Sequence, residues 1–297
     1  MLIPSYLKPG DTIGIISTAR KISKSELKPA IKLFEDWGLN VVTGKNIFNS
    51  CNQFAGNDEE RASDLQDMLD NDDIKAIICA RGGYGTVRIV DLINFNNFIN
   101  KPKWLIGYSD ITVLHSHIQN LGVETLHAIM PVNINKASAY AIETLRKALF
   151  GEDLKYEVKA NIFNRTGEAN GTITGGNLSV LYSIAGSRSE VDFKDKILFL
   201  EDLDEYLYHI ERMLINLKRR GIFRQISGLI IGGMTEMHDN TIPFGNDAYE
   251  IINDIVSDYN YPVCYNFPAG HIDDNRALIL GRDISLKVGI SNSVINF

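Results

Sequence analysis

The sequence has little cysteine, no long hydrophobic run and no excess of positive charge, and each absence narrows what the protein can be. Its three cysteines, Cys51, Cys79 and Cys264, are odd in number, far apart and without a CxxC pair. Neither a disulfide framework nor a zinc site is expected, and a reducing compartment fits. No run approaches the ~18 apolar residues that a membrane helix needs. The start, "MLIPSYLKPGD", lacks the basic and then apolar stretches of a signal peptide. We therefore expect a cytoplasmic protein without a membrane partner.

The charge balance argues against nucleic-acid binding as the main task. The formal net charge is -7, and no stripe of lysine and arginine is present to neutralise a phosphate backbone. The densest basic cluster, "KRR" at 218–220, lies at the end of an expected helix and before Gly221, where cations complement the helix dipole. We therefore predict no nucleic-acid partner.

Length and composition indicate a globular chain of two domains. The 297 residues are 44% hydrophobic and 23% charged, and this length exceeds what one core usually serves. The segment after Gly151 is polar with little periodicity, as a linker would be. We predict an N-terminal domain over 1–150, a linker over 151–170 and a C-terminal domain over 171–297.

The first half alternates short β-branched runs with helical patterns. This alternation predicts an α/β domain, flavodoxin-like, with a mostly parallel sheet between flanking helices. The expected strands are 11–18, 39–43, 74–80, 103–108 and 123–127, and the expected helices are 24–37, 58–71, 84–93, 110–121 and 138–150.

The second half predicts a further α/β domain with a mixed sheet. A "GRD" triplet at 281–283 is interpreted as a turn between two antiparallel arms. The expected strands are 171–176, 196–201, 227–233, 261–266 and 277–289, and the expected helices are 177–186, 204–220 and 246–258.

Two unusual turns follow buried strands of the first half, at the edge where parallel sheets bind ligands. One is "RGGYG", Arg81 to Gly85, whose outward amides could hold a phosphate or an oxyanion, or simply form a turn. It is neither a Walker A loop nor a G-x-G-x-x-G motif. The other is Ser109 in "GYSDI", either a helix N-cap or a nucleophile beside the Asp110 amide. Two special turns at one edge favour a site there.

A serine nucleophile needs a base and a group that orients the base. Among six histidines, His271 in the glycine-flanked loop "FPAGHIDDNRA" is the best candidate, and a loop histidine without a function is the alternative. Glu201 begins an acidic cluster at the end of a buried strand and could orient that imidazole. The alternative interpretation is an acidic first helical turn that includes Asp202, Asp204 and Glu205.

At these residues the sequence resembles the LD-carboxypeptidase family, serine peptidases that include muramoyltetrapeptide carboxypeptidases and microcin C immunity proteins. Residues and spacing alone indicate only a candidate acyl-transfer site. The resemblance implies a triad of Ser109 as nucleophile, His271 as general base and Glu201 as its partner, with the amides of Gly83 and Asp110 as the oxyanion hole. It rests on six blocks in the family's order: "FAGNDEERASDLQ", "AIICARGGYGTVRIVDLI", "IGYSDITVLH", "GGNLSVLYSIAG", "LFLEDLDEYLYHIERML" and "PAGHIDDNRALILG".

The resemblance also implies an activity. The expected substrate is the cytoplasmic murein tetrapeptide of cell-wall recycling, which would lose its terminal D-Ala through an acyl-enzyme without cofactor or metal. The relatives imply a homodimer. Arg81 is a candidate for the terminal carboxylate, with a structural salt bridge as an equal alternative. Three other functions stay open: microcin immunity by hydrolysis of an aminoacyl-nucleotide, a non-catalytic peptide-binding protein, and phosphate binding at "RGGYG".

Overall fold

Alternating strands and helices build a six-stranded sheet in the first part of the chain. The computed structural model describes residues 1–297. The first five strands are parallel in the spatial order 2-1-3-4-5, as in flavodoxin-like folds, and β11 adds an antiparallel strand beside β5. This confirms the predicted mostly parallel sheet. The strands are β1 (Thr12–Ile16), β2 (Asn40–Thr43), β3 (Ile74–Cys79), β4 (Trp104–Gly107), β5 (Thr125–His127) and β11 (Leu278–Leu280).

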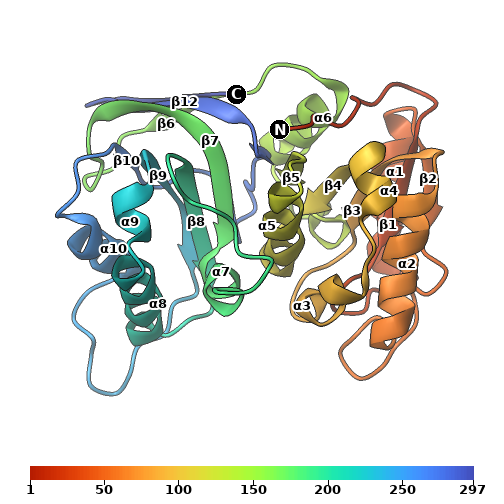
Figure 1. Cartoon of the computed structure of the whole chain (residues 1–297), viewed down its shortest axis with the longest axis horizontal. Helices are drawn as coiled ribbons and strands as arrows, with labels where there is room; N and C mark the ends of the chain where they lie inside the picture. Colours follow the sequence, from red (N-terminus) through yellow and green to blue (C-terminus); the bar gives the residue numbers. More distant parts are fainter.

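Helices cover both faces of this sheet (Figure 1). Successive strand residues point to opposite faces, so that Ile78 packs with α1 and α6 while Ile77 packs with α2, α4 and α5. Capping boxes of Ser23 with Glu26 and of Asn57 with Glu60 fix the starts of α1 and α2. The helices are α1 (Lys24–Asp36), α2 (Asp58–Asp70), α3 (Thr86–Ile89), α4 (Asn96–Asn100), α5 (Thr112–Asn120) and α6 (Ala139–Phe150).

A seven-stranded mixed sheet forms the second lobe, as predicted. Its order is β10-β9-β8-β7-β12-β13-β6, with β7 to β10 parallel and the other three antiparallel. The strands are β6 (Lys155–Lys159), β7 (Gly167–Asn177), β8 (Ile197–Leu203), β9 (Gly228–Thr235), β10 (Val263–Cys264), β12 (Asp283–Val288) and β13 (Asn292–Asn296); the helices are α7 (Leu178–Ser183), α8 (Leu207–Arg219), α9 (Ile222–Gln225) and α10 (Ala248–Val256).

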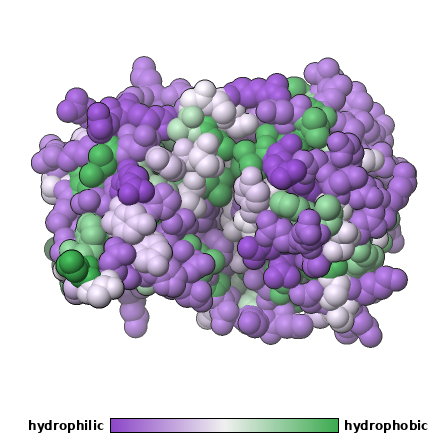
Figure 2. Space-filling view, turned by 90° about the horizontal axis from the view of Figure 1, so that it is seen from below, coloured by the Kyte–Doolittle hydropathy of each residue, from purple (hydrophilic) through white to green (hydrophobic).

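The two lobes share one hydrophobic core. Helices α7, α8 and α10 cover one face of the second sheet, whereas side chains of its other face, such as Phe199 and Phe267, join a 40-residue cluster with Trp104 and Leu126 of the first sheet. The lobes therefore cannot separate without exposing apolar surface. Figure 2 shows a mostly hydrophilic surface seen from below, with a hollow between the lobes. No helix combines the length and apolar character that crossing a bilayer requires.

The predicted antiparallel pairing of the two arms around 281–283 is wrong, although the chain does turn at Gly281. The two arms do not pair with each other, because β11 pairs with β5 of the first sheet while β12 pairs with β7 of the second. All three residues of β11 are buried and close the edge of the first sheet. Arg282 marks the crossing, where its Nε donates to Glu124 at 2.9 Å.

The segment 151–170 is not irregular throughout. It contains β6, which pairs with β13, and in which buried Tyr156 and Val158 alternate with exposed residues. β7 begins at Gly167, still within the predicted linker. The division into two domains at these boundaries stays a prediction. Strand β13 and helices α4 and α9 were not predicted from the sequence.

Gly175 in β7 provides a test of how closely the strands of the second lobe pack. Its φ is +126°, and a Cβ at this position would overlap the carbonyl oxygen of Phe199. We expect Gly175→Ala to lower the free energy of unfolding by at least ~2 kcal/mol. Gly186 has φ +78°, and no atom lies within 4 Å of the place that a Cβ would take, so Gly186→Ala should cost only ~1 kcal/mol. Urea denaturation measures both, and equal losses would contradict the expected clash.

Candidate active site

Ser109 lies on a sharp strand-to-helix turn. β4 ends at Gly107, and a 3₁₀ turn over Ser109–Ile111 leads directly into α5. Ser109 itself has φ +65°, a left-handed conformation that is uncommon for a residue other than glycine. The N-cap position of this turn is occupied by Tyr108, and Ser109 Oγ contacts His271 instead of a backbone amide. The turn instead presents the hydroxyl to His271, and the N-cap alternative does not describe this serine.

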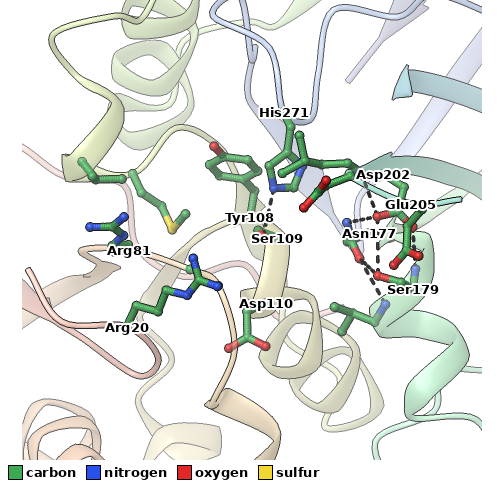
Figure 3. A pocket seen from close by; sticks show the side chains of 17 residues that line it. Arg20, Arg81, Tyr108, Ser109, Asp110, Asn177, Ser179, Asp202, Glu205 and His271 are labelled. Atoms are coloured by element: carbon green, nitrogen blue, oxygen red, sulfur yellow. Dashed lines mark hydrogen bonds between the residues drawn. The ribbon is translucent and has the colours of Figure 1, made fainter. Parts of the chain in front are cut away.

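Two hydrogen bonds link three side chains from distant parts of the chain. Ser109 Oγ lies 3.0 Å from His271 Nε2, and His271 Nδ1 lies 2.7 Å from Glu201 Oε2. Ser109 belongs to the first lobe, Glu201 lies in β8, and His271 lies in the loop after β10. The structure therefore brings together the three residues that the resemblance implied. Figure 3 shows the contact between Ser109 and His271. This arrangement allows a proton to pass from the hydroxyl to an imidazole that a carboxylate orients.

The loop that carries His271 is held by bonds on both sides. Gly270 N donates to Oδ1 of the buried Asn275 at 2.9 Å. Thr235 Oγ1 donates to the carbonyl oxygen of His271 at 3.2 Å. These contacts hold the imidazole between Ser109 and Glu201.

Electrostatics favour a proton on His271. Burial opposes the charge of the imidazolium, but the negative charge of Glu201 and its hydrogen bond outweigh burial, and the pKa of His271 is raised above its usual value. Glu201 is fully buried, and its second oxygen has no hydrogen-bond partner. The imidazole is thus the one hydrogen-bond partner of this carboxylate.

Residues whose backbone amides are free lie beside the serine in the cavity wall. Gly82, Gly83 and Asp110 line the same cavity as Ser109, and the N–H groups of Gly83 and Asp110 have no acceptor within the protein. A Cβ on Gly82 would lie 3.1 Å from Ser109 Cβ, so glycine permits this close approach. The Asp110 carboxylate accepts from Thr86 N at 2.8 Å and is thereby occupied elsewhere. Free amides next to a hydroxyl are suited to stabilise an oxyanion.

The cavity, of about 400 Å³, has walls of opposite charge. Figure 3 draws Arg20 and Arg81 on one side of Ser109 and Asn177, Ser179, Asp202 and Glu205 on the other. Arg81, the predicted carboxylate-binding residue, lines the cavity. It also forms a salt bridge, because its Nη1 lies 3.3 Å from Glu26 Oε1.

The polar wall contains groups that were missed or misinterpreted from the sequence. Asp202 accepts from Asn177 Nδ2 at 2.8 Å and from Ser179 N at 2.9 Å. Burial, and next the charge of Glu201, raise the pKa of Asp202 to about 7. The interpretation of the acidic cluster as a first helical turn is wrong, because α8 begins only at Leu207 and has no acidic residue in its first turn. Asn177 could have been noticed as the polar residue that ends β7.

Four of the remaining histidines have other hydrogen-bond partners, whereas neither ring nitrogen of the buried His127 has one. Buried His115 lies 2.9 Å from the Gly107 carbonyl oxygen, and burial lowers its pKa to about 4. His209 pairs with Glu205, and His238 pairs with Asp204. No group of three or more histidine, cysteine, aspartate or glutamate side chains is arranged to hold a metal ion.

The chain is similar to known proteins along nearly its whole length. The LD-carboxypeptidase N-terminal domain matches residues 13–128, and the LD-carboxypeptidase C-terminal domain matches residues 170–286. A probable murein peptide carboxypeptidase of Bacillus subtilis is 34% identical, over 98% of this chain and 93% of that protein. The microcin C7 self-immunity protein MccF of Escherichia coli is 26% identical, over 99% and 95%.

The fold is also shared with a solved structure. The crystal structure of muramoyltetrapeptide carboxypeptidase from Oxalobacter formigenes superposes with a TM-score of 0.87 and 27% identity, over 96% of this chain and 98% of that chain. Both domain families and the end-to-end similarity lead to one conclusion: the chain belongs to the LD-carboxypeptidase family of hydrolases.

Proposed function

We propose that the chain is a serine carboxypeptidase that removes the terminal D-Ala from murein tetrapeptides, with Ser109, His271 and Glu201 as its catalytic triad. The observation that carries this proposal is the pair of hydrogen bonds, 3.0 Å and 2.7 Å, that joins the three side chains. A serine hydroxyl is a weak nucleophile, and it becomes effective when a base accepts its proton.

In the first step, Ser109 Oγ attacks the carbonyl carbon before the terminal residue while His271 Nε2 takes the hydroxyl proton. Glu201 stabilises the imidazolium that forms. The carbonyl oxygen gains negative charge and is bound by the N–H groups of Gly83 and Asp110. These two amides are free of other acceptors, which fits this role.

In the second step, the tetrahedral intermediate collapses. His271 gives its proton to the leaving amine as the C–N bond breaks, and the terminal residue departs. A water molecule then loses a proton to His271 and attacks the ester of Ser109, which releases the shortened peptide and restores the hydroxyl. Every proton in this sequence passes through one imidazole.

The choice of substrate is supported by the names of the relatives and by the arginine side chains of the cavity. Relatives are named murein peptide carboxypeptidase and muramoyltetrapeptide carboxypeptidase, and they match nearly the whole chain. A cytoplasmic location, a role in cell-wall recycling and a homodimer are proposed on the family resemblance. Arg81 stays a proposed contact of the terminal carboxylate.

Microcin immunity is the second candidate function, because MccF matches 99% of this chain. The alignment with MccF needs 331 positions for the 297 residues of this chain, whereas the alignment with the B. subtilis protein needs 302. The MccF alignment therefore contains more gaps. The comparison favours the murein substrate. A non-catalytic binding protein is disfavoured by the complete triad.

The proposal predicts that the wild type removes one alanine from free murein tetrapeptide and that Ser109→Ala does not. Loss of the hydroxyl removes the nucleophile but leaves the fold unchanged, because Ser109 Oγ bonds only His271. Mass spectrometry of the diaminopimelate and lysine forms measures the reaction. Glu59→Gln, an exposed change on α2, is the control for preparation and should retain full activity.

Two outcomes would oppose the proposal. If wild-type protein leaves both tetrapeptides intact but cleaves an aminoacyl-nucleotide, the microcin function takes its place. If alanine release persists in Ser109→Ala at the wild-type rate, Ser109 is not the nucleophile.

The raised pKa of His271 predicts the pH dependence of kcat/KM. The neutral imidazole is the base, so activity should increase as pH rises through a pKa above the usual value near 6.5. In Glu201→Gln the negative charge is lost while burial remains, so the acidic limb should move to lower pH. The maximum should fall roughly a thousandfold or more. A pH–rate profile measures both effects, and an unmoved acidic limb would mean that Glu201 does not control the imidazole.

A further inference from the structure

Arg20 is a cavity residue that none of the family motifs includes. It follows β1, in a loop beside the one after β3 that carries Arg81 and Gly83. The strand order reverses between β1 and β3, which is where sheets of this type bind ligands. Figure 3 shows the Arg20 side chain extending into the cavity toward Ser109.

The backbone and stem of Arg20 are fixed against the oxyanion loop. Its N–H donates to the Gly82 carbonyl oxygen at 3.4 Å, and the residue forms a β-bridge with Phe54. A Cβ on Gly83 would lie within 2.7 Å of Arg20 Cγ. The absence of a side chain on Gly83 therefore makes room for the arginine stem beside a proposed oxyanion donor.

The Arg20 guanidinium has no hydrogen-bonded partner, although its charge acts on the buried Asp110 carboxylate, whereas the Arg81 guanidinium is paired. Arg20 has no salt bridge and no side-chain hydrogen bond within the protein, while Arg81 pairs with Glu26 at 3.3 Å. The other oxygen of Glu26 accepts from Ser23 N at 2.8 Å, and hydrogen bonds from Ser23, ahead of the charge of Arg81, lower the pKa of Glu26. Glu26 thus stays ionised and occupies the Arg81 guanidinium.

The geometry of a peptide end restricts where its carboxylate can lie. In a dipeptide unit the terminal carboxylate is within about 4 Å of the attacked carbonyl carbon. It must therefore lie close to Ser109. The wall with Asp202, Asp204 and Glu205 offers a carboxylate no lysine or arginine, which leaves the arginine side of the cavity.

We propose that Arg20 binds the terminal carboxylate of the leaving residue and so selects peptides with a free C-terminus. This inference rests on the proposed carboxypeptidase function and assigns its recognition of the chain end to a residue outside the family motifs. The guanidinium offers two parallel N–H donors, which match the two oxygens of a carboxylate. Arg81, already paired with Glu26, is a second and weaker contact of the same carboxylate.

The test compares the tetrapeptide with the same peptide ending in a carboxamide. Dissociation constants are measured by calorimetry in the Ser109→Ala background, which prevents turnover. We expect the free acid to bind roughly 10- to 100-fold more tightly than the amide. Adding Arg20→Gln should weaken binding of the acid by that factor and leave the amide unchanged. Lys21→Gln is the matched control, since Lys21 bonds Ser50 outside the cavity, and it should change neither.

Three results would overturn the assignment of Arg20. The first is equal affinity for the acid and the amide when Arg20 is present. The second is an equal loss of affinity for both peptides in Arg20→Gln, and the third is a loss of affinity for the acid alone in Arg81→Gln and not in Arg20→Gln. Turnover by the protein with Ser109 intact separates this inference from the function beneath it. If tetrapeptide is cleaved, any of these results removes only the role of Arg20; if it is not cleaved, the proposed function and the role of Arg20 fail together.

Discussion

The contact between Glu201 and His271 is the interaction on which the site depends. Glu201 has no exposed surface, one of its oxygens has no partner, and the other accepts from the imidazole. A buried carboxylate is costly unless a hydrogen bond or an opposite charge compensates it. The imidazole supplies that compensation, and in return the carboxylate fixes its orientation and raises its pKa. The same hydrogen bond therefore compensates the buried carboxylate in the fold and orients the imidazole in the site.

The shared core explains how a serine from one sheet meets a histidine from the other lobe. The 40-residue cluster includes strands of both sheets, and β11 carries the chain from the His271 loop into the first sheet beside β5. Asn177 N, at the end of β7, donates to Thr112 Oγ1 at 3.1 Å and so joins the second sheet to α5, just after Ser109. A two-lobed protein with a flexible linker would not keep a hydrogen bond between its lobes at fixed length. In this protein the shared apolar core keeps the two lobes, and so the hydrogen bond between them, in a fixed position.

The sequence predicted most of the local structure, because capping boxes and strand patterns are local signals. It could not predict which sheet each strand would join. The arms around "GRD" resemble a hairpin, yet the open edge beside β5 accepts β11. β6 was missed although "KYEVK" alternates, because polar residues surround it.

For the site, residues alone indicated an acyl-transfer centre, and the family resemblance supplied the roles of Ser109, Glu201 and His271. Arg20 went unnoticed because it lies in none of the six blocks, and Asn177 was given no role although it lies in "GGNLSVLYSIAG". Their place in the cavity depends on how loops pack, and that information is not contained in spacing along the chain.

Labelling with a fluorophosphonate tests most directly whether Ser109 is activated by His271. Such a probe reacts with a serine whose proton a neighbouring base accepts, and tandem mass spectrometry locates the adduct. We expect a single adduct on Ser109 that forms in the wild type and fails to form in His271→Ala. Absence of labelling in the folded wild type, or an adduct on another serine, would contradict the activation of Ser109.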